Sequence, residues 1–221
     1  MANASLVAAV IINFKTPDLI RRAATSFRTF YPTVQLLLID NGSHDESADV
    51  LRELRHQSPG HTSVIMNKEN RHHGPAMDQA LRHEQTPYVL FLDSDCEVLR
   101  GGLLEGMMDL AERNPACYAI GKQIWMNRRG FDVHDGSTAH PYIRPICMLV
   151  RRQMYLSLPP FQRHGAPCLK NMLHAARNRM TLVDFPVEEY IVHKGRGTAA
   201  RHGYRLGWRG KLNFVMNRLG L

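Results

Sequence analysis

Short apolar runs alternate with amphipathic stretches through the first half of this 221-residue chain. The strongest runs are LVAAVII at 6–12, VQLLLI at 34–39 and YVLFL at 88–92, and each is too short to form a helix by itself. Between the runs, apolar residues recur at helical spacing, as they do over 19–27. Strands that are apolar throughout and alternate with helices indicate a parallel sheet covered on both faces, so the sequence predicts an α/β fold.

Local motifs predict where the first helices begin. The order Thr16-Pro17-Asp18 is typical of an N-cap residue followed by the first turn of a helix. Residues 43–46 match the Ser-x-x-Glu capping box, which predicts that Ser43 caps a second helix. The remaining elements of this half are expected as a strand at 62–66 and a helix at 75–84.

A polar segment follows each of the four predicted strands. These segments are 13–16, 40–43, 67–74 and 93–97. In open parallel sheets, ligands bind beyond the carboxyl ends of the strands, where such segments meet. We therefore expect all four segments to line one crevice.

The second half of the chain has a less regular pattern. It contains no internal repeat, low-complexity tract or linker, so one domain over 1–221 is expected. The predicted elements are helices at 103–111, 151–156 and 169–179, strands at 117–125, 146–150, 181–185 and 190–193, and a polar loop at 127–142.

The positive charge of the chain is concentrated at its C-terminal end. The whole chain has a formal net charge of +8, but residues 141–221 contain 14 Lys and Arg against 3 Asp and Glu, a balance of +11. Such asymmetry indicates an anionic partner, which could be nucleotide phosphate, an acidic acceptor, nucleic acid or a membrane surface. Because no nucleic-acid-binding motif is present, no specific nucleic-acid partner is expected.

Two acidic residues follow the YVLFL strand directly. Asp93 and Asp95 stand two positions apart, so their carboxylates can point to the same side of the crevice. Carboxylate oxygens suit Mg²⁺ or Mn²⁺, which also bind phosphate. Neither GxGxxG nor GxxxxGK[ST] occurs in the sequence, which argues against a Rossmann dinucleotide site and a P-loop. A bound divalent cation is therefore the expected means of holding phosphate.

The sequence also bears on location. Cys96, Cys117, Cys147 and Cys168 show no CxxC pairing, no apolar run reaches the ~20 residues of a membrane span, and the N-terminus lacks a signal-peptide pattern. We expect a cytoplasmic protein with reduced thiols. Residues 204–221 form a basic amphipathic stretch, which is compatible with a helix on the inner face of an anionic membrane or with one packed on the core.

Five segments in order resemble the GT-A nucleotide-sugar glycosyltransferases, particularly the large family 2. The segments are VAAVIINFKTPDLIRRAATSF, LLLIDNGSHDES, NKENRHHGPAMDQAL, VLFLDSDCEV and VHKGRGT, and the likeness covers about residues 6–200. The resemblance implies a mostly parallel central sheet with helices on both faces. It also implies a nucleotide-sugar-binding half at about 1–100, an acceptor half at about 101–200 and a C-terminal tail at 201–221.

The resemblance further implies roles for individual residues. Asp40 would contact the nucleotide base, and Asp93 the sugar or ribose, while Asp95 would bind the metal and His193 the metal or the diphosphate. Lys194 and Arg196 follow His193 and would lie near the phosphates. The nucleoside would also be bordered by Asn13, Phe14, Asn70, Arg71 and Gly74.

The chain departs from the family pattern at the general base. Many family 2 enzymes supply an acidic pair where this chain has residues 159–171, which contain no acid. A transfer with inversion needs a group that accepts the proton of the acceptor. Asp135, with its neighbour His134, and His164 are the substitutes that the sequence offers. A retaining enzyme or an acceptor that is already an anion would need no such base.

The function expected from these features is metal-dependent transfer of a sugar from a UDP-, GDP- or dTDP-sugar, with Mn²⁺ or Mg²⁺ as cofactor. The acceptor is unknown, and a lipid-linked or cell-envelope glycan is one class that fits. Two alternatives stay open: a GT-A-fold nucleotide-binding protein without catalysis, and a sugar-1-phosphate nucleotidyltransferase. The loop at 13–17 lacks the glycine-rich, basic pattern of the nucleotidyltransferases.

Overall fold

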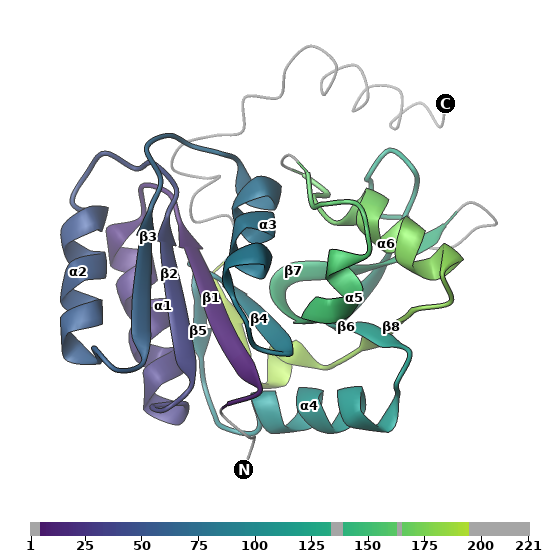
Figure 1. The fold of residues 1–221 in the computed structure, drawn as a ribbon, viewed down its shortest axis with the longest axis horizontal. Coiled ribbons are helices and arrows are strands. Elements are labelled where there is room, and N and C mark those ends of the chain that lie inside the picture. Colours follow the sequence, from purple (N-terminus) through teal and green to yellow (C-terminus); the bar gives the residue numbers. More distant parts are fainter. Residues whose placement is uncertain (1–4, 134–138, 163–164, 195–221) are drawn as a thin grey trace.

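A seven-stranded sheet forms the centre of the molecule (Figure 1). The computed structural model describes residues 5–133, 139–162 and 165–194. The strand order in the sheet is β3-β2-β1-β4-β7-β6-β8, and β5 pairs with β9 in a separate two-stranded sheet. The strands are β1 (Val7–Asn13), β2 (Gln35–Asp40), β3 (Thr62–Met66), β4 (Tyr88–Asp93), β5 (Cys96–Val98), β6 (Cys117–Met126), β7 (His140–Arg151), β8 (Thr181–Asp184) and β9 (Ile191–His193).

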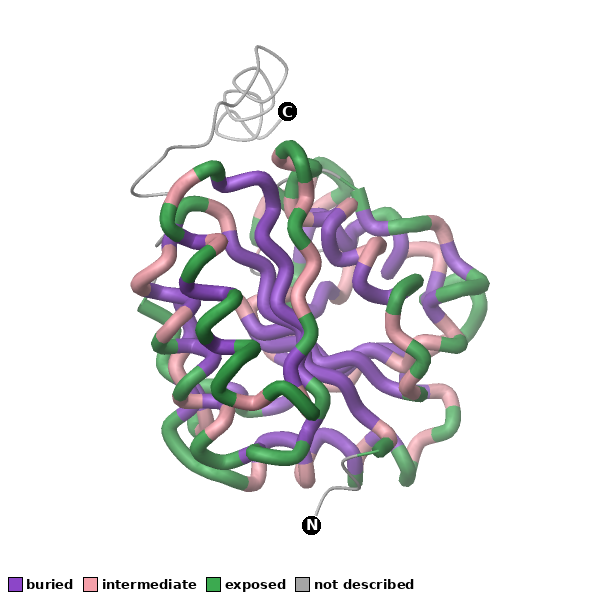
Figure 2. The backbone as a smooth tube through the Cα atoms, turned by 60° about the vertical axis from the view of Figure 1, so that its left-hand side comes forward, coloured by how far each residue is buried: buried purple, intermediate pink, exposed green. Residues whose placement is uncertain are grey.

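The first half of the sheet is parallel, as the apolar runs predict. β1 pairs in parallel with β2 on one side and with β4 on the other, and β3 extends the sheet beyond β2. All seven residues of β1 are buried, which explains its unbroken apolar sequence. Figure 2 shows this buried centre between more exposed outer segments.

Helices cover both faces of the sheet. Val7, Ala9 and Ile11 of β1 pack with α1, α2 and α4 on one face, whereas Val10 and Ile12 pack with α3, α5 and α6 on the other. The alternation follows from the pleat of a strand, which sends successive side chains to opposite faces. The helices are α1 (Pro17–Phe30), α2 (Ser47–Gln57), α3 (His73–His83), α4 (Leu103–Arg113), α5 (Arg152–Leu156) and α6 (Leu169–Arg177), with a 3₁₀ turn at Val187–Glu189.

The second half adds antiparallel strands to the same sheet. β7 runs antiparallel to both β4 and β6, while β8 runs parallel to β6. The resulting sheet is mixed but mostly parallel, as expected for the GT-A class. β7 begins at His140, earlier than the predicted strand at 146–150, because its first residues pair with the end of β6 beyond an irregularity at Gly121/Gln123.

One of the two predicted helix caps is wrong. Thr16 is the N-cap residue of α1, as expected, although its hydroxyl donates a hydrogen bond to Asn13 Oδ1 at 3.0 Å and forms no side-chain cap. α2 begins only at Ser47, and the hydroxyl of Ser43 donates instead to the carboxylate of Asp40. Both side chains are used to hold the turns that follow β1 and β2.

All four cysteines lie in described segments, and each is a free, buried thiol, as expected for reduced cysteines. Within the described part of the chain, no helix combines the length and apolar character that crossing a membrane requires. The stretch at 204–221 lies outside the described residues, so its expected contact with a membrane stays a prediction, as does the cytoplasmic location.

Candidate functional site

A pocket of about 490 Å³ opens at the carboxyl ends of β1 and β4. Residues from all four polar segments of the sequence line it, among them Phe14, Asn41, Asn70 and Asp93. The structure therefore brings together the segments that the parallel topology predicts to meet. The opposite wall comes from the β6–β7 hairpin and the segment before α6, and consists of Ile124, Met126, Gly130, Asp132, Tyr142, Arg144, Pro145, Ile146, Gly165 and Pro167.

Two carboxylates lie together at the end of β4. Asp95 is buried, with 9% of the residue exposed, and the side chain of Asp93 is about a quarter exposed. Burial and the neighbouring charge of Asp95 raise the pKa of Asp93 to about 7. The carboxyl group of Asp93 therefore retains a proton over a pH range in which an ordinary aspartate is ionised.

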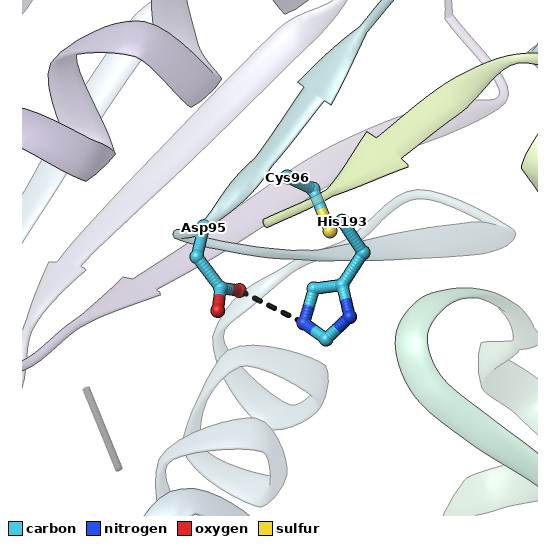
Figure 3. A group of neighbouring side chains, drawn as sticks. All are labelled: Asp95, Cys96 and His193. Carbon is cyan, nitrogen blue, oxygen red and sulfur yellow. Dashed lines mark ion pairs between the residues drawn. The ribbon is translucent and has the colours of Figure 1, made fainter. Parts of the chain in front are cut away.

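His193 reaches these carboxylates from the end of β9. Its Nε2 lies 3.2 Å from Asp95 Oδ1 (Figure 3). The pairing of β5 with β9 positions the imidazole, since the register places Cys96 directly opposite His193. The hydrogen bond to Asp95 raises the pKa of His193 above its ordinary value. The sequence prediction that His193 and Asp95 lie together is consistent with this geometry.

These side chains fit a divalent cation. Asp93 and Asp95 offer carboxylate oxygens, which suit both Mn²⁺ and Mg²⁺, and His193 offers an imidazole nitrogen, which suits Mn²⁺ better than Mg²⁺. The repulsion between the two carboxylates, expressed in the raised pKa of Asp93, is the kind of strain that a bound cation relieves. Metal binding by Asp95 and His193 nevertheless stays a prediction.

Asn13 and Asp40 lie beneath the pocket and are not among the residues that line it. Asn13 Nδ2 donates hydrogen bonds to Asp40 Oδ1 at 3.2 Å and to Ser43 Oγ at 3.3 Å. The backbone N–H of Ser43 donates to Asp40 Oδ2 at 3.0 Å. This network fixes the turn after β2 against the end of β1, and a contact of Asn13 or Asp40 with a nucleoside stays a prediction.

Asn41 was not predicted as a site residue, yet it lines the pocket with Asn70. Its Nδ2 donates to Asn70 Oδ1 at 3.2 Å, and its Oδ1 accepts hydrogen bonds from Asn67 Nδ2 and the backbone N–H of Arg71. Arg71 itself is exposed and lies outside the pocket lining. The neighbouring turns after β2 and β3 are thus joined through one asparagine, which follows the predicted Asp40 directly.

At the start of α3, His73 rather than Gly74 faces the pocket. His73 Nε2 lies 3.7 Å from Asp93 Oδ1, and burial lowers the pKa of His73 to about 4, so the imidazole is neutral at pH 7. Gly74 is buried against the backbone of Gln162, where an added Cβ would lie 2.7 Å from its nearest atoms. Gly74 therefore allows close packing, and its proposed place beside the ribose stays a prediction.

The far wall contains a charged pair that the sequence reasoning missed. Arg144 of β7 forms an ion pair with Asp132, and Tyr142 of the same strand lies buried in the wall. Asp132 falls in the predicted polar loop at 127–142, where nothing in the sequence distinguishes one acid from another. Only the pairing of β6 with β7 places this pair across from the β4 carboxylates.

The remaining predicted residues lie beside the pocket or outside the described chain. Lys194 Nζ lies 2.5 Å from Glu97 Oε1, and the backbone N–H of Lys194 donates to the carbonyl of Asp95 at 3.0 Å. Lys194 is thus close to the carboxylate cluster without lining the pocket. Asp135, His164 and Arg196 lie outside the described residues.

The sequence model of glycosyl transferase family 2 matches residues 8–183. The chain belongs to glycosyl transferase family 2. The match includes β1, β4 and the Asp93–Asp95 segment, and it ends before β9. Membership in the family agrees with the resemblance of the five sequence segments and with the mixed sheet.

Among solved family 2-like folds, the mannosyltransferase PcManGT of Pyrobaculum calidifontis, in complex with GDP-Man and Mn²⁺, superposes with a TM-score of 0.67 at 15% identity. That likeness covers 82% of this chain and 55% of the mannosyltransferase. Glucosyl-3-phosphoglycerate synthase of Mycobacterium tuberculosis, with Mn²⁺, UDP and glucosyl-3-phosphoglycerate, gives a TM-score of 0.60 at 15% identity, over 98% of this chain and 81% of the synthase. At this identity the two structures establish the fold.

A curated relative of this family 2 chain is the undecaprenyl-phosphate 4-deoxy-4-formamido-L-arabinose transferase of Salmonella choleraesuis strain SC-B67. The two are 29% identical over 82 residues. The aligned part is 37% of this chain and 25% of the relative, so the chain matches about a quarter of that transferase's length.

Proposed function

We propose that this family 2 protein transfers a sugar from a nucleotide-sugar donor to an acceptor, with Mn²⁺ or Mg²⁺ as cofactor. The observation that supports the proposal most is the cluster of Asp93, Asp95 and His193 in a pocket at the carboxyl end of β4. The pocket volume of about 490 Å³ falls within the range of about 300–1,000 Å³ that small-molecule sites occupy. Similarly folded proteins hold GDP-Man, UDP and Mn²⁺.

The nucleoside would bind along the near wall of the pocket. Phe14 presents an aromatic ring, while Asn41 and Asn70 present amide groups to the same space. Asn13 and Asp40 would support this wall from beneath through their hydrogen bonds to Ser43 and to each other. On this proposal, residues 1–100 bind the donor and residues 101–200 receive the acceptor.

The sugar and diphosphate would lie over the end of β4. Asp95 and His193, with Asp93 beside them, would hold the cation, which supplies positive charge to the departing nucleoside diphosphate. Arg144 provides a permanent positive charge on the opposite wall, and its ion pair with Asp132 holds it there before a ligand binds. An arginine so placed can form paired hydrogen bonds to phosphate oxygens.

The proton of a hydroxyl acceptor needs a receiving group. Among described residues, Asp132 is the carboxylate on the far wall, and we propose it as a candidate base. Asp135 and His164 remain candidates from the sequence. The described residues of the segment 159–171 supply no carboxylate, so a base on the β6–β7 side is the simplest solution.

The acceptor that we propose is a lipid-linked or cell-envelope glycan or lipid. Its support is the name of the Salmonella relative, an undecaprenyl-phosphate transferase, and the basic composition of residues 141–221. A phosphate acceptor would already be anionic and would need no general base. The donor nucleotide is expected to be UDP, GDP or dTDP.

A GT-A-fold protein that binds nucleotides without catalysis is the second candidate function, favoured by the missing acidic pair at 159–171. Isothermal calorimetry with UDP, GDP and dTDP in Mn²⁺ tests the binding that both functions share. Release of nucleoside diphosphate from the corresponding sugars then separates them. Binding with turnover supports transfer, binding without turnover across a broad donor panel supports the second candidate, and no binding contradicts both.

A further inference from the structure

Cys96 adds a sulfur atom to the group formed by Asp95 and His193. In the antiparallel β5–β9 pair, Cys96 lies directly opposite His193, a position from which side chains project to the same face. The donor atoms of Asp95, Cys96 and His193 all lie within 4.8 Å of one another (Figure 3). Three donors of different types therefore converge from the turn before β5, from β5 itself and from β9, which is far away in the sequence.

The combination of oxygen, sulfur and nitrogen donors favours a different cation from the carboxylates alone. Zn²⁺ binds cysteine sulfur, histidine nitrogen and aspartate oxygen, whereas Mg²⁺ takes oxygen ligands. Soft sulfur ligands select thiophilic ions from the divalent cations available. A site made of Asp95, Cys96 and His193 therefore has the donor set of a zinc site.

The donor group lies beside the pocket. Cys96 is fully buried, and its Sγ donates a hydrogen bond of 3.5 Å to the carbonyl oxygen of Ile146. Ile146 and His193 line the pocket whereas Cys96 does not, so a cation would have to reach the sulfur from the pocket side. Asp93 contributes a second carboxylate nearby, which favours positive charge at this position.

We propose that Asp95, Cys96 and His193 bind a thiophilic divalent cation of the zinc class. The thiol of Cys96 loses its proton to solvent as its sulfur bonds to the cation. Asp95 would be a ligand of only one cation at a time, so zinc-class ions would compete with Mn²⁺ or Mg²⁺ for it. This consequence alone rests on the proposed transferase function.

The sulfur contact is tested with Co²⁺, which reports thiolate ligation by a charge-transfer absorption in the near ultraviolet. The full chain is titrated with Co²⁺ under reducing conditions, and Zn²⁺ is then added to displace it. We expect the band to appear and to disappear with Zn²⁺. Tighter binding of Zn²⁺ than of Mn²⁺ would not by itself test the proposal, since most nitrogen, oxygen and sulfur sites follow that order.

Variants assign the band to this site. Cys96→Ser should abolish the band and weaken Zn²⁺ binding at least about 10-fold, while Cys117→Ser, at another buried thiol at the start of β6, should keep both. If Cys96→Ser does not fold, His193→Ala at a partly exposed side chain should cause the same loss of affinity.

Co²⁺ binding without a charge-transfer band, or a band that persists in Cys96→Ser, overturns the proposal. An unchanged Zn²⁺ affinity in His193→Ala also overturns it. Because these readouts involve no nucleotide, they can fail while sugar transfer is observed, and they can succeed where transfer is absent.

Discussion

The surroundings of Asp93 in the pocket change the ionisation of its carboxyl group. It lies between Asp95 and His73, and its ionisation is opposed by burial and by the second carboxylate. Ionisation of a carboxyl group in such surroundings lowers the stability of the folded protein, and a bound cation restores it. The same property would suit a donor site, where the charge of a diphosphate and a metal must be balanced.

The pKa of Asp93 predicts a specific pH dependence of stability. The folded pKa of about 7 exceeds the ordinary value near 4, so the protonated carboxyl stabilises the fold below about pH 4 and this contribution is lost as the pH rises through about 7. We therefore compare the free energies of unfolding of Asp93→Asn and the wild type in the presence of a chelator. The difference between them should shift in favour of the variant by about 2 kcal/mol from pH 5 to pH 8. Urea unfolding at the two pH values measures this difference, and an equal effect of the substitution at both would contradict it.

At the residue scale, sequence reasoning found the acidic pair but missed several of its neighbours. Asp93 and Asp95 could be predicted because they directly follow the apolar run at 88–92, which forms β4 up to Asp93. His73, Asp132 and Arg144 occur in polar stretches that contain several similar residues, and only tertiary pairing selects one of them. Asn41 lies in the segment 40–43 that was expected to line the crevice, but only its neighbour Asp40 was given an individual role.

The approach of α3 to the segment after α5 depends on Gly74. A methyl group at this position would meet the Gln162 backbone at 2.7 Å, and backbone atoms cannot move aside as a flexible side chain can. We expect Gly74→Ala to destabilise the fold by about 1–3 kcal/mol. Gly60→Ala, where the added Cβ has no neighbour within 4 Å, is the matched control and should change stability by less than about 0.5 kcal/mol. Similar thermal shifts in both variants would refute the packing argument.

Arg28 ties α1 to the strands beneath it. Its guanidinium group donates to the backbone carbonyls of Val34 and His61 and to Thr62 Oγ1 at 2.9 Å. Arg28→Met should destabilise the protein by about 2 kcal/mol, since the partly buried Val34 carbonyl loses its charged donor and the His61 carbonyl keeps only the backbone N–H of Leu36. Arg22→Met at an exposed position of the same helix should be nearly neutral. A chemical denaturation curve for each variant checks this, and equal stabilities would show that the contacts contribute little.

At the element scale, local signals predicted most strands and helices but misjudged their ends. The third strand was predicted with its observed bounds, β1 and β2 are each shifted by one residue at both ends, and β4 is longer by one residue at its end. The N-cap position of Thr16 is confirmed, but the Ser43 cap is wrong because the Ser43 hydroxyl donates to Asp40, a contact that depends on the adjacent strand. β5 was not predicted, because its residues fall at the end of the polar segment 93–97 that follows the strand at 88–92.

At the scale of the molecule, the pocket lies where a parallel half meets an antiparallel one. The parallel half could be predicted because its strands and helices follow one another in order, and their carboxyl ends must share an edge. The antiparallel wall could not, because β7 pairs with β4 across a long separation in the sequence that no local pattern encodes. The wall of the pocket at the ends of β1 and β4 was thus predicted in outline, and the wall formed by β6 and β7 was not.

The uneven charge of the chain predicts binding to anionic membranes. The sequence of residues 204–221 combines apolar and basic residues, and the net charge of residues 141–221 is +11. The full chain should sediment with phosphatidylglycerol vesicles but not with phosphatidylcholine vesicles, and removal of 204–221 should reduce the bound fraction strongly. Equal sedimentation of the full and shortened chains would remove this segment from the account.

The central claim is that Asp95 organises a metal-dependent transfer from a nucleotide sugar. Release of nucleoside diphosphate from UDP-, GDP- and dTDP-sugars should be followed in Mn²⁺ and after chelation, for the wild type and for Asp95→Asn. We predict turnover of at least one donor class that is lost on chelation and that falls by about 10²-fold or more in Asp95→Asn, with the variant still folded. Turnover that survives both chelation and the substitution would contradict the account.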